Sequence, residues 1–316
     1  MEEGTGSESS ASGSEGGQTQ EESSADYPSH AIEFYVGFGP GGGTDLFARA
    51  VAEEMEDILD ANINVINREG ASGTVMLEEA ANQPADGYTV AAISSFPVTT
   101  ALETNENGLE VFQPLARFQA DTFGLMSSPD TFKNLDEFVK EAKENPGEIE
   151  IGGVGSGGFD EMAAQIFIQE TGLDLNYVPF DGSGDLQSAL LGGNVDVSLE
   201  EIGPSIDYLE SGEMTPLAFL SEERLEDFPD TPATGEEGWD VELGVERGFA
   251  VHKDTPKEIQ KTLEEAMKEA YETDSYQEVE ENSYLHYKEG WLNSEDYTEK
   301  LESDIELFSE TSEDLE

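Results

Sequence analysis

The sequence predicts an α/β protein built as two lobes, and three observations support this fold class. Strand-like and helix-like segments alternate through the first third of the chain, and the same alternation starts again downstream. Each alternation contains a glycine-rich segment between an apolar run and an amphipathic one. The length of 316 residues suits two domains of ordinary size.

The first alternation follows residues 1–28, which are rich in Gly, Ser and Glu and are interpreted as a flexible acidic tether. Ordered structure is expected from about Ala31. Short β-branched apolar runs predict strands, and apolar residues three or four positions apart predict helices. The expected elements are a strand at 32–38, a helix capped by Thr44 or Asp45, a strand at 63–67, a helix at 73–82 and a strand at 88–94.

The second alternation has the same character. Its expected strands are 122–128, 148–155, 175–180, 195–200 and 214–220, and its expected helices are 134–145, 160–170 and 184–191. The run RGFAVH at 247–252 is expected to return to the first lobe, before a helix that starts at Pro256 and another at 294–308. We therefore expect lobe 1 to comprise 29–120 and 247–316, and lobe 2 to comprise 121–246, with two crossings between them.

The charge balance limits the possible partners. The chain has 14 Lys and Arg against 72 Asp and Glu, a net charge of −58, which argues against a nucleic acid partner. Beyond the tether the acidic residues alternate with regularly spaced apolar ones, as in VAEEMEDILDANINVI, so we expect a folded chain with an acidic surface. Such a surface indicates adaptation to high salt, which screens the repulsion. Cysteine is absent, which excludes disulfides and thiolate sites.

The segment FGPGGGTD at 38–45 is the sharpest local signal. It joins a predicted strand to a predicted helix, and its glycines let the backbone approach a ligand closely. The free N–H groups and the dipole of the helix N-terminus favour an anion at this point. The segment lacks the Lys-Ser/Thr ending of a phosphate loop and the spacing of a dinucleotide fingerprint. The simpler interpretation is a tight turn between strand and helix.

A second segment of the same kind, GGVGSGGF at 152–159, begins the helix expected at 160–170. Two such loops, one in each lobe, would give a cleft two anion-binding walls. A third loop, VPFDGSGD at 178–185, either extends that wall or is a plain turn. Ser94 and Ser95 follow a predicted strand, where their hydroxyls are expected to donate to a ligand. Arg49 and Arg68 are the only basic residues before Arg117, and we expect Arg49 to form a structural ion pair.

In this order the motifs resemble those of the substrate-binding receptors of tripartite tricarboxylate transporters, also called Bug-type receptors. The resemblance covers about residues 32–309. The matching stretches are Phe38–Asp45 with Ala48 and Arg49, Asn67–Thr74, Pro84–Thr89, Asn145–Gly147, Val178–Gly182, Leu190–Asp196 and Ser211–Gly212. The sequence departs from the family pattern at three positions, where Asp160-Glu161 replace a segment that usually ends in His, Asp181 replaces Lys, and Glu200 replaces Asp.

The resemblance implies a type II periplasmic-binding fold, with a ligand cleft between two hinged α/β lobes. It also implies an extracytoplasmic receptor that captures a small carboxylate and delivers it to membrane transporter subunits. The residues expected to bind the ligand are Phe38, Gly41, Gly42, Gly43, Thr44, Asp45, Ser94, Ser95, Gly155, Ser156, Gly157, Gly158, Phe159, Phe180, Gly182 and Glu200. The acidic departures leave a ligand with an amino group, such as an acidic amino acid, as an alternative.

Further expectations concern the natural setting of the receptor. We expect a monomer without a cofactor, held at the membrane by an N-terminal lipid anchor that a missing leader would have supplied. A sensory role rather than transport stays open. A metal-bound ligand also stays open, because Asp160, Glu161, Asp181, Glu200 and Glu201 could gather around a hard cation. An enzyme is not expected, because neither a G-x-S-x-G elbow nor a histidine near a glycine loop is present.

Overall fold

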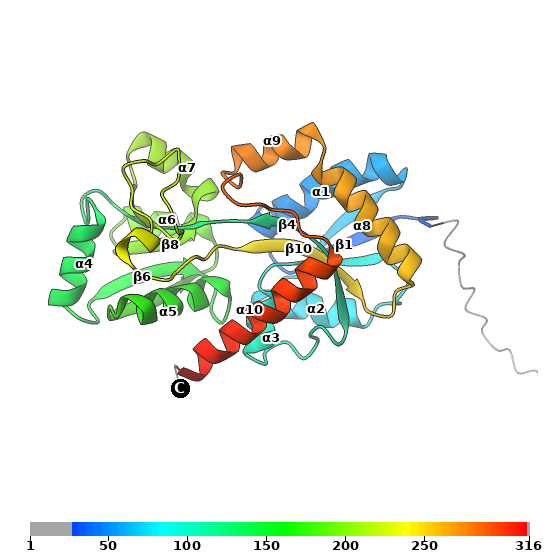
Figure 1. Cartoon of the computed structure of the whole chain (residues 1–316), viewed down its shortest axis with the longest axis horizontal. Helices are drawn as coiled ribbons and strands as arrows, with labels where there is room; N and C mark the ends of the chain where they lie inside the picture. Colours follow the sequence, from blue (N-terminus) through cyan, green and yellow to red (C-terminus); the bar gives the residue numbers. More distant parts are fainter. Residues whose placement is uncertain (1–26, 315–316) are drawn as a thin grey trace, which may run out of the picture.

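A computed structural model describes residues 27–314 of the chain, so most of the predicted tether lies outside the described residues. Two five-stranded sheets form the frame, and Figure 1 shows them side by side, with strands β4 and β10 running between them. Helices cover both sheets. Within residues 27–314, no helix is both long and apolar enough to cross a membrane.

Lobe 1 is built on the sheet with strand order β2-β1-β3-β10-β4. Strands β1, β2 and β3 run parallel, whereas β10 is antiparallel to both β3 and β4. The predicted return of 247–252 to the first lobe is therefore confirmed. The strands are β1 Ile32–Val36, β2 Ile63–Asn67, β3 Thr89–Ile93, β4 Phe112–Ala120 and β10 Glu246–His252. The helices are α1 Gly43–Leu59, α2 Thr74–Ala81, α3 Phe96–Ala101, α8 Lys257–Tyr271, α9 Asp274–Asn282 and α10 Ser294–Asp314.

Lobe 2 repeats this plan with the order β7-β6-β8-β5-β9. Strand β6 is parallel to β7 and β8, and β5 is antiparallel to β8 and β9. The strands are β5 Phe123–Ser127, β6 Ile149–Val154, β7 Leu175–Phe180, β8 Val197–Glu201 and β9 Thr215–Phe219. The helices are α4 Leu135–Glu144, α5 Phe159–Thr171, α6 Ser183–Leu191 and α7 Ile202–Ser211.

Alternating residues of β1 explain the layers of lobe 1. Phe34 and Val36 lie in one apolar core with residues of α1 and α8, while Tyr35 lies in a second core with residues of α2 and α10. Because successive side chains of a strand point to opposite faces, helices must cover both sides of the sheet. The layers thus bring the N-terminus of α1 to the carboxyl end of β1.

Three elements were not expected from the sequence, namely β4, α3 and α7, whereas α9 lies in the part after 247–252 that was expected to be helical. The cap of α1 also differs from the prediction: the N-cap residue is Gly42, and neither Thr44 nor Asp45 occupies that position. Ordered contacts begin before Ala31, because the buried Tyr27 donates a hydrogen bond of 2.7 Å from its hydroxyl to the carbonyl of Gly87.

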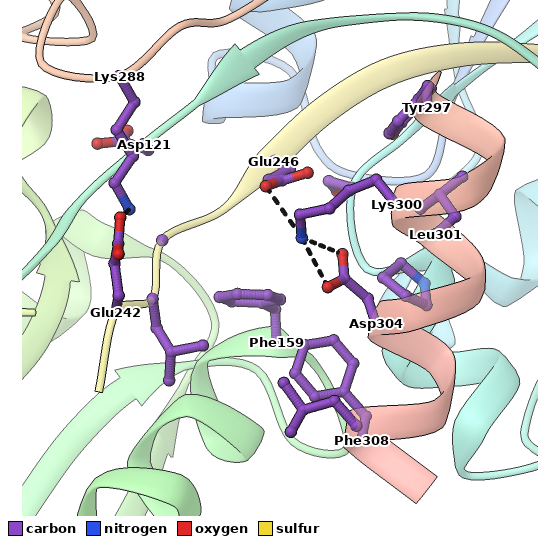
Figure 2. A pocket seen from close by; sticks show the side chains of 15 residues that line it. Asp121, Phe159, Glu242, Glu246, Lys288, Tyr297, Lys300, Leu301, Asp304 and Phe308 are labelled. Carbon is purple, nitrogen blue, oxygen red and sulfur yellow. Dashed lines mark hydrogen bonds and ion pairs between the residues drawn. The ribbon is translucent and has the colours of Figure 1, made fainter. Parts of the chain in front are cut away.

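Helix α10 spans the junction of the lobes. Its first half packs on α3 and β4, with Tyr297 and Leu301 in a core of lobe 1. Near its end Phe308 joins the main core of lobe 2, where its ring meets that of Phe159 at 5.8 Å between centroids. In Figure 2 these two rings lie next to each other below strand β10. The last turns of α10 therefore connect the lobes at the start of α5.

Candidate functional site

The first glycine loop ends at the N-terminus of α1, as predicted. Gly41 has a φ of +82°, which favours glycine, and its N–H donates to a carboxylate oxygen of Asp45 at 2.8 Å. Asp45 is fully engaged by its neighbours, since Arg49 donates two hydrogen bonds of 2.9 Å and Asn67 donates one of 2.8 Å. The structural ion pair predicted for Arg49 is thus confirmed. The first-turn N–H groups of α1 have no hydrogen-bond partner within residues 27–314.

The second glycine loop is built in the same way at the start of α5. Gly157 has a φ of +66°, and its N–H donates to a carboxylate oxygen of Glu161 at 2.7 Å. The hydroxyl of Ser156 reaches the same oxygen at 3.2 Å, and Asp160 accepts a hydrogen bond of 2.8 Å from the N–H of Val154. In both loops the third residue of the helix therefore binds the backbone two residues before the helix, which fixes the loop shape.

The second glycine loop contacts lobe 1 at Ser72 and lies close to Ser95. The hydroxyl of Ser72, just before α2, donates to the carbonyl of Ser156 at 3.2 Å. A methyl group at Gly158 would lie 3.1 Å from the Ser72 hydroxyl oxygen and 3.9 Å from that of Ser95. The hydroxyl of Thr44 in turn donates to Ser94 at 3.3 Å. These contacts bring residues predicted from both lobes to one interface.

A buried arginine that the sequence analysis did not include lies at this interface. Arg247, the second residue of β10, is 6% exposed, and its guanidinium forms an ion pair with Glu201 at the end of β8. A side chain at Gly43 would collide with the same guanidinium. The Nε–H of Arg247 has no hydrogen-bond partner among the described residues. The interface thus contains one buried cation beside the N-terminus of α1, with one donor unused.

Several carboxyl groups surround this arginine. Desolvation raises the pKa of Asp160 to about 8 and the pKa of Glu200 to about 7, and the nearby Glu201 raises both further. Desolvation also raises the pKa of Asp121 well above its usual range, with the charge of Glu201 acting in the same direction. The lobe 2 side of the interface therefore contains several buried carboxyl groups whose raised pKa values favour the neutral, protonated form.

The remaining predicted residues lie farther inside lobe 2. Phe180 packs at the edge of the α6 core, and its carbonyl accepts a hydrogen bond of 2.8 Å from the N–H of Gly155. Gly182 is the N-cap of α6. The Phe159 ring lies in the lobe 2 core, and the carboxylate of Glu200 accepts hydrogen bonds from Gln187 and Ser198. For these residues the side chains support the loops, so a ligand would meet mainly the backbone.

A cavity of about 190 Å³ lies beside α10 and is also lined by the segment 242–244 before β10 and by the starts of α3 and α5. It shares Ser94 and Phe159 with the predicted binding residues. Figure 2 shows Lys300 between Glu246 and Asp304, with N–O distances of 3.3 and 2.6 Å. Lys288 lies 3.4 Å from Glu242. Because both lysines are already paired, this cavity suits a carboxylate less well than the glycine loops do.

The acidic residues do not assemble into a metal site. Within residues 27–314 no group of three or more His, Asp or Glu side chains is arranged to hold a metal ion. The structure therefore gives no support to the metal-bound alternative that the five acidic positions suggested.

Comparison with known proteins places this geometry in context. The model of the tripartite tricarboxylate transporter family receptor matches residues 47–304. The protein BugT of Bordetella pertussis is 32% identical over 219 residues, which are 67% of each chain. A TctC solute-binding protein from Polaromonas, solved without ligand, is 27% identical with a TM-score of 0.74 over 91% of this chain and 99% of its own. A malate-bound protein of Rhodopseudomonas palustris has the same fold at 22% identity, with a TM-score of 0.79 over 90% of this chain and 99% of its own.

Proposed function

Because the chain belongs to the family of tripartite tricarboxylate transporter receptors, we propose that it captures a small carboxylate between its lobes and delivers it to a membrane transporter. Members of this family are extracytoplasmic solute receptors and not enzymes. The lobes of the proposal are residues 29–120 with 247–316, and residues 121–246. The receptor would act as a monomer, tethered to a lipid anchor through residues 1–28.

The observation that carries the proposal is that the N-termini of two helices, one in each lobe, lie next to the same pair of serines: Thr44 of α1 donates to Ser94, and a Cβ at Gly158 before α5 would lie 3.9 Å from the hydroxyl of Ser95. Helices α1 and α5 both begin at glycine loops, and the first-turn N–H groups of both lack partners within residues 27–314. Such groups, together with the helix dipole, bind anions without a neighbouring Lys or Arg. A carboxylate is the anion that the family relationship favours, and malate in the palustris structure is one example.

An anion site in the cavity beside α10 is less well supported, because Lys288 and Lys300 already form ion pairs with Glu242 and Glu246. We therefore propose that the ligand contacts the two glycine loops and the end of β3. The contact residues are Gly41, Gly42, Gly43, Thr44, Ser94, Ser95, Ser156, Gly157 and Gly158. Of the other predicted residues, Phe38, Asp45, Gly155, Phe159, Phe180, Gly182 and Glu200 would act by shaping the loops.

Calorimetry in molar KCl with succinate, malate, citrate and adipate tests the proposal. Gly42 has an extended backbone, so Gly42→Val keeps an allowed conformation but places a branched side chain against the open amides. We expect this variant to bind about 10- to 100-fold more weakly, the effect of one lost charge-assisted hydrogen bond.

Gly184→Val is the matched control, because a Cβ at Gly184 would meet no atom within 4 Å. Unchanged melting temperatures of both unliganded variants would show that the fold is intact. Equal affinity of Gly42→Val and wild type would remove the first loop from the site, and the absence of binding for every acid would contradict the receptor function for small carboxylates.

A further inference from the structure

Residues 70–73, between β2 and α2, have an unusual backbone. All four have positive φ angles, which are 136° at Gly70, 48° at Ala71, 52° at Ser72 and 93° at Gly73. Two of the four carry a side chain, for which the left-handed conformation is unfavourable. Residues in such conformations need support from the surrounding structure, and they gather at functional sites. The segment therefore requires an explanation beyond that of a simple connection.

The segment packs on the start of the first glycine loop. A Cβ at Gly37, directly after β1, would lie 2.5 Å from the Cα of Gly73, so the two backbones are in close contact. A Cβ at Gly73 would in turn lie 3.6 Å from the ring of Phe38. The carbonyl of Val36 accepts a hydrogen bond of 2.7 Å from the N–H of Arg68. These contacts fix the segment to lobe 1 at the point where the first glycine loop leaves β1.

On its other side the segment faces the second glycine loop, which belongs to lobe 2. The hydroxyl of Ser72 donates to the carbonyl of Ser156 at 3.2 Å. A Cβ at Gly158 would lie 3.1 Å from the Ser72 hydroxyl oxygen, and a Cβ at Gly155 would lie 3.9 Å from it. The lack of side chains at these two glycines leaves room for the hydroxyl. Ser72 thus reaches the second glycine loop from lobe 1.

Resting on the proposed receptor function, we propose that Ser72 is a positioning residue of the ligand site. Its hydroxyl holds the second glycine loop against lobe 1, so that the backbone N–H groups of both loops face one ligand. Because the bond joins different lobes, it breaks when they separate. It therefore stabilises only the arrangement in which both loops contact the ligand, and the unfavourable backbone of residues 70–73 places the hydroxyl there.

Ser72→Ala and Ser72→Gly separate this role from a structural one. Both variants lose the hydroxyl, but only Ser72→Gly also relieves the unfavourable backbone conformation. We expect both to bind about three- to tenfold more weakly, the effect of one neutral hydrogen bond. Without ligand, Ser72→Gly should nevertheless melt about 2 °C higher than Ser72→Ala. Calorimetry with succinate, malate, citrate and adipate and thermal melting, both in molar KCl, measure these effects.

Ser211→Ala is the matched control. The hydroxyl of Ser211 also donates to a backbone carbonyl at 3.2 Å, but its acceptor, Tyr208, lies in the same helix. Loss of this bond should leave the affinity unchanged, because the bond does not join the lobes. Affinities that simply follow the melting temperatures of the variants would give Ser72 a purely structural role and overturn the proposal.

A double-mutant cycle tests the contact between Ser72 and Gly158 directly. Gly158 has an extended backbone, with a φ of −116°, so Gly158→Ala is conformationally allowed. Its Cβ would crowd the Ser72 hydroxyl at 3.1 Å. Gly158→Ala should therefore weaken binding of the acids in the wild type, and its effect should be at least about threefold smaller in the Ser72→Gly background. Independent effects would mean that Ser72 and the second loop are not in contact when ligand is bound.

Distance measurements between spin labels follow the lobes themselves. Because the chain has no cysteine, labels can be placed at Glu78→Cys in lobe 1 and Glu170→Cys in lobe 2, where both side chains are exposed. With saturating acid in molar KCl, we expect a single distance in the wild type and a mixture of distances in Ser72→Ala. A single distance in both proteins would show that Ser72 does not hold the lobes together.

The outcomes distinguish this inference from the proposed function. Wild-type binding that Ser72→Ala and Ser72→Gly leave unchanged overturns the positioning role of Ser72 and leaves the carboxylate receptor intact. If the wild type binds none of the four acids, the receptor function for small carboxylates is contradicted, and the inference that rests on it falls as well.

Discussion

The chemistry of Asp160 is strongly altered by its place in the fold. Its carboxylate accepts one backbone hydrogen bond from Val154 and faces Glu200, Glu201 and Arg247. Desolvation, aided by the two glutamates, raises its pKa from 3.8 to about 8. Between these values the folded state holds a proton that the unfolded state has released, so the free energy of unfolding must fall as pH rises.

Asp160→Asn should remove this contribution while keeping an acceptor for the Val154 N–H. We expect the variant to become more stable than wild type as pH rises, by up to about 1.4 kcal/mol per pH unit, and the difference to level off above the folded pKa. Urea unfolding in molar KCl between about pH 5 and pH 9 measures it. Asp174→Asn, an exposed change just after the same helix, is the control. Parallel curves for wild type and Asp160→Asn would contradict the elevated pKa.

A comparison of the loop glycines with Arg247 shows how much of the site could be predicted from the sequence. Both glycine loops were predicted, because Gly41 and Gly157 stand in local patterns that link a strand to a helix. Arg247 was missed, because its only local signal is a place at the start of a strand. Its importance comes from contacts with Gly43 and Glu201, which are distant in sequence and which no local pattern encodes.

Among the elements, α10 has a role that its amphipathic pattern alone does not suggest. The pattern predicted a helix at 294–308, and the structure extends it to Asp314. Its apolar residues do not all face one lobe: Leu301 packs in lobe 1, whereas Phe308 packs in lobe 2. The helix thus connects the lobes beside the second glycine loop.

Phe308→Ala should therefore destabilise the protein strongly. The side chain is 2% exposed, and truncation of a buried phenylalanine costs about 3–5 kcal/mol. Leu307→Ala, one residue earlier on the same helix, removes a side chain that is 46% exposed and should change the free energy of unfolding by less than about 0.5 kcal/mol. Urea unfolding in molar KCl gives both values. Similar small effects for the two variants would mean that α10 is not anchored in lobe 2.

The elements that were not predicted have physical reasons in common. Strand β4 contains Pro114 and Arg117, which interrupt its apolar run, and it lies at the edge of its sheet, where proline is tolerated. The structure accommodates Arg117 through Glu246 at 2.8 Å and the backbone carbonyls of Glu289 and Gly290. Helices α3 and α7 include Pro97 and Pro204 in their first turns, where proline is tolerated although it is a helix breaker elsewhere. Tertiary partners thus outweighed the local signals.

At the scale of the whole molecule, several contacts join the lobes, and three of them involve the glycine loops or α10. These three are a hydrogen bond between Ser72 and Ser156, the buried ion pair of Arg247 with Glu201, and the aromatic contact of α10 with α5. The first two lie at the glycine loops, where the proposed ligand would bind both walls. A ligand that contacts both lobes favours the closed arrangement, so binding and lobe closure are expected to be coupled.

The net charge of −58 sets the conditions under which all these contacts can form. Repulsion among so many carboxylates acts against every compact state, and salt screens the repulsion between exposed charges that lie farther apart than the Debye length, about 10 Å at 0.1 M and about 3 Å at 1 M. In dilute buffer we expect the repulsion to exceed a typical folding margin of about 5–15 kcal/mol, so the protein should unfold. Far-UV circular dichroism during dialysis from molar KCl to low salt measures the loss of structure.

The cause of that salt requirement can be separated from general stabilisation by cosolutes. NaCl and KCl at equal ionic strength should preserve the fold about equally, because screening depends on ionic strength rather than on the identity of the cation. Sucrose, which stabilises compact states by exclusion from the protein surface but screens no charge, should not replace them. A cooperative thermal transition that stays the same from low to molar salt would show that the acidic surface is tolerated without screening, and adaptation to salt would then no longer explain the composition.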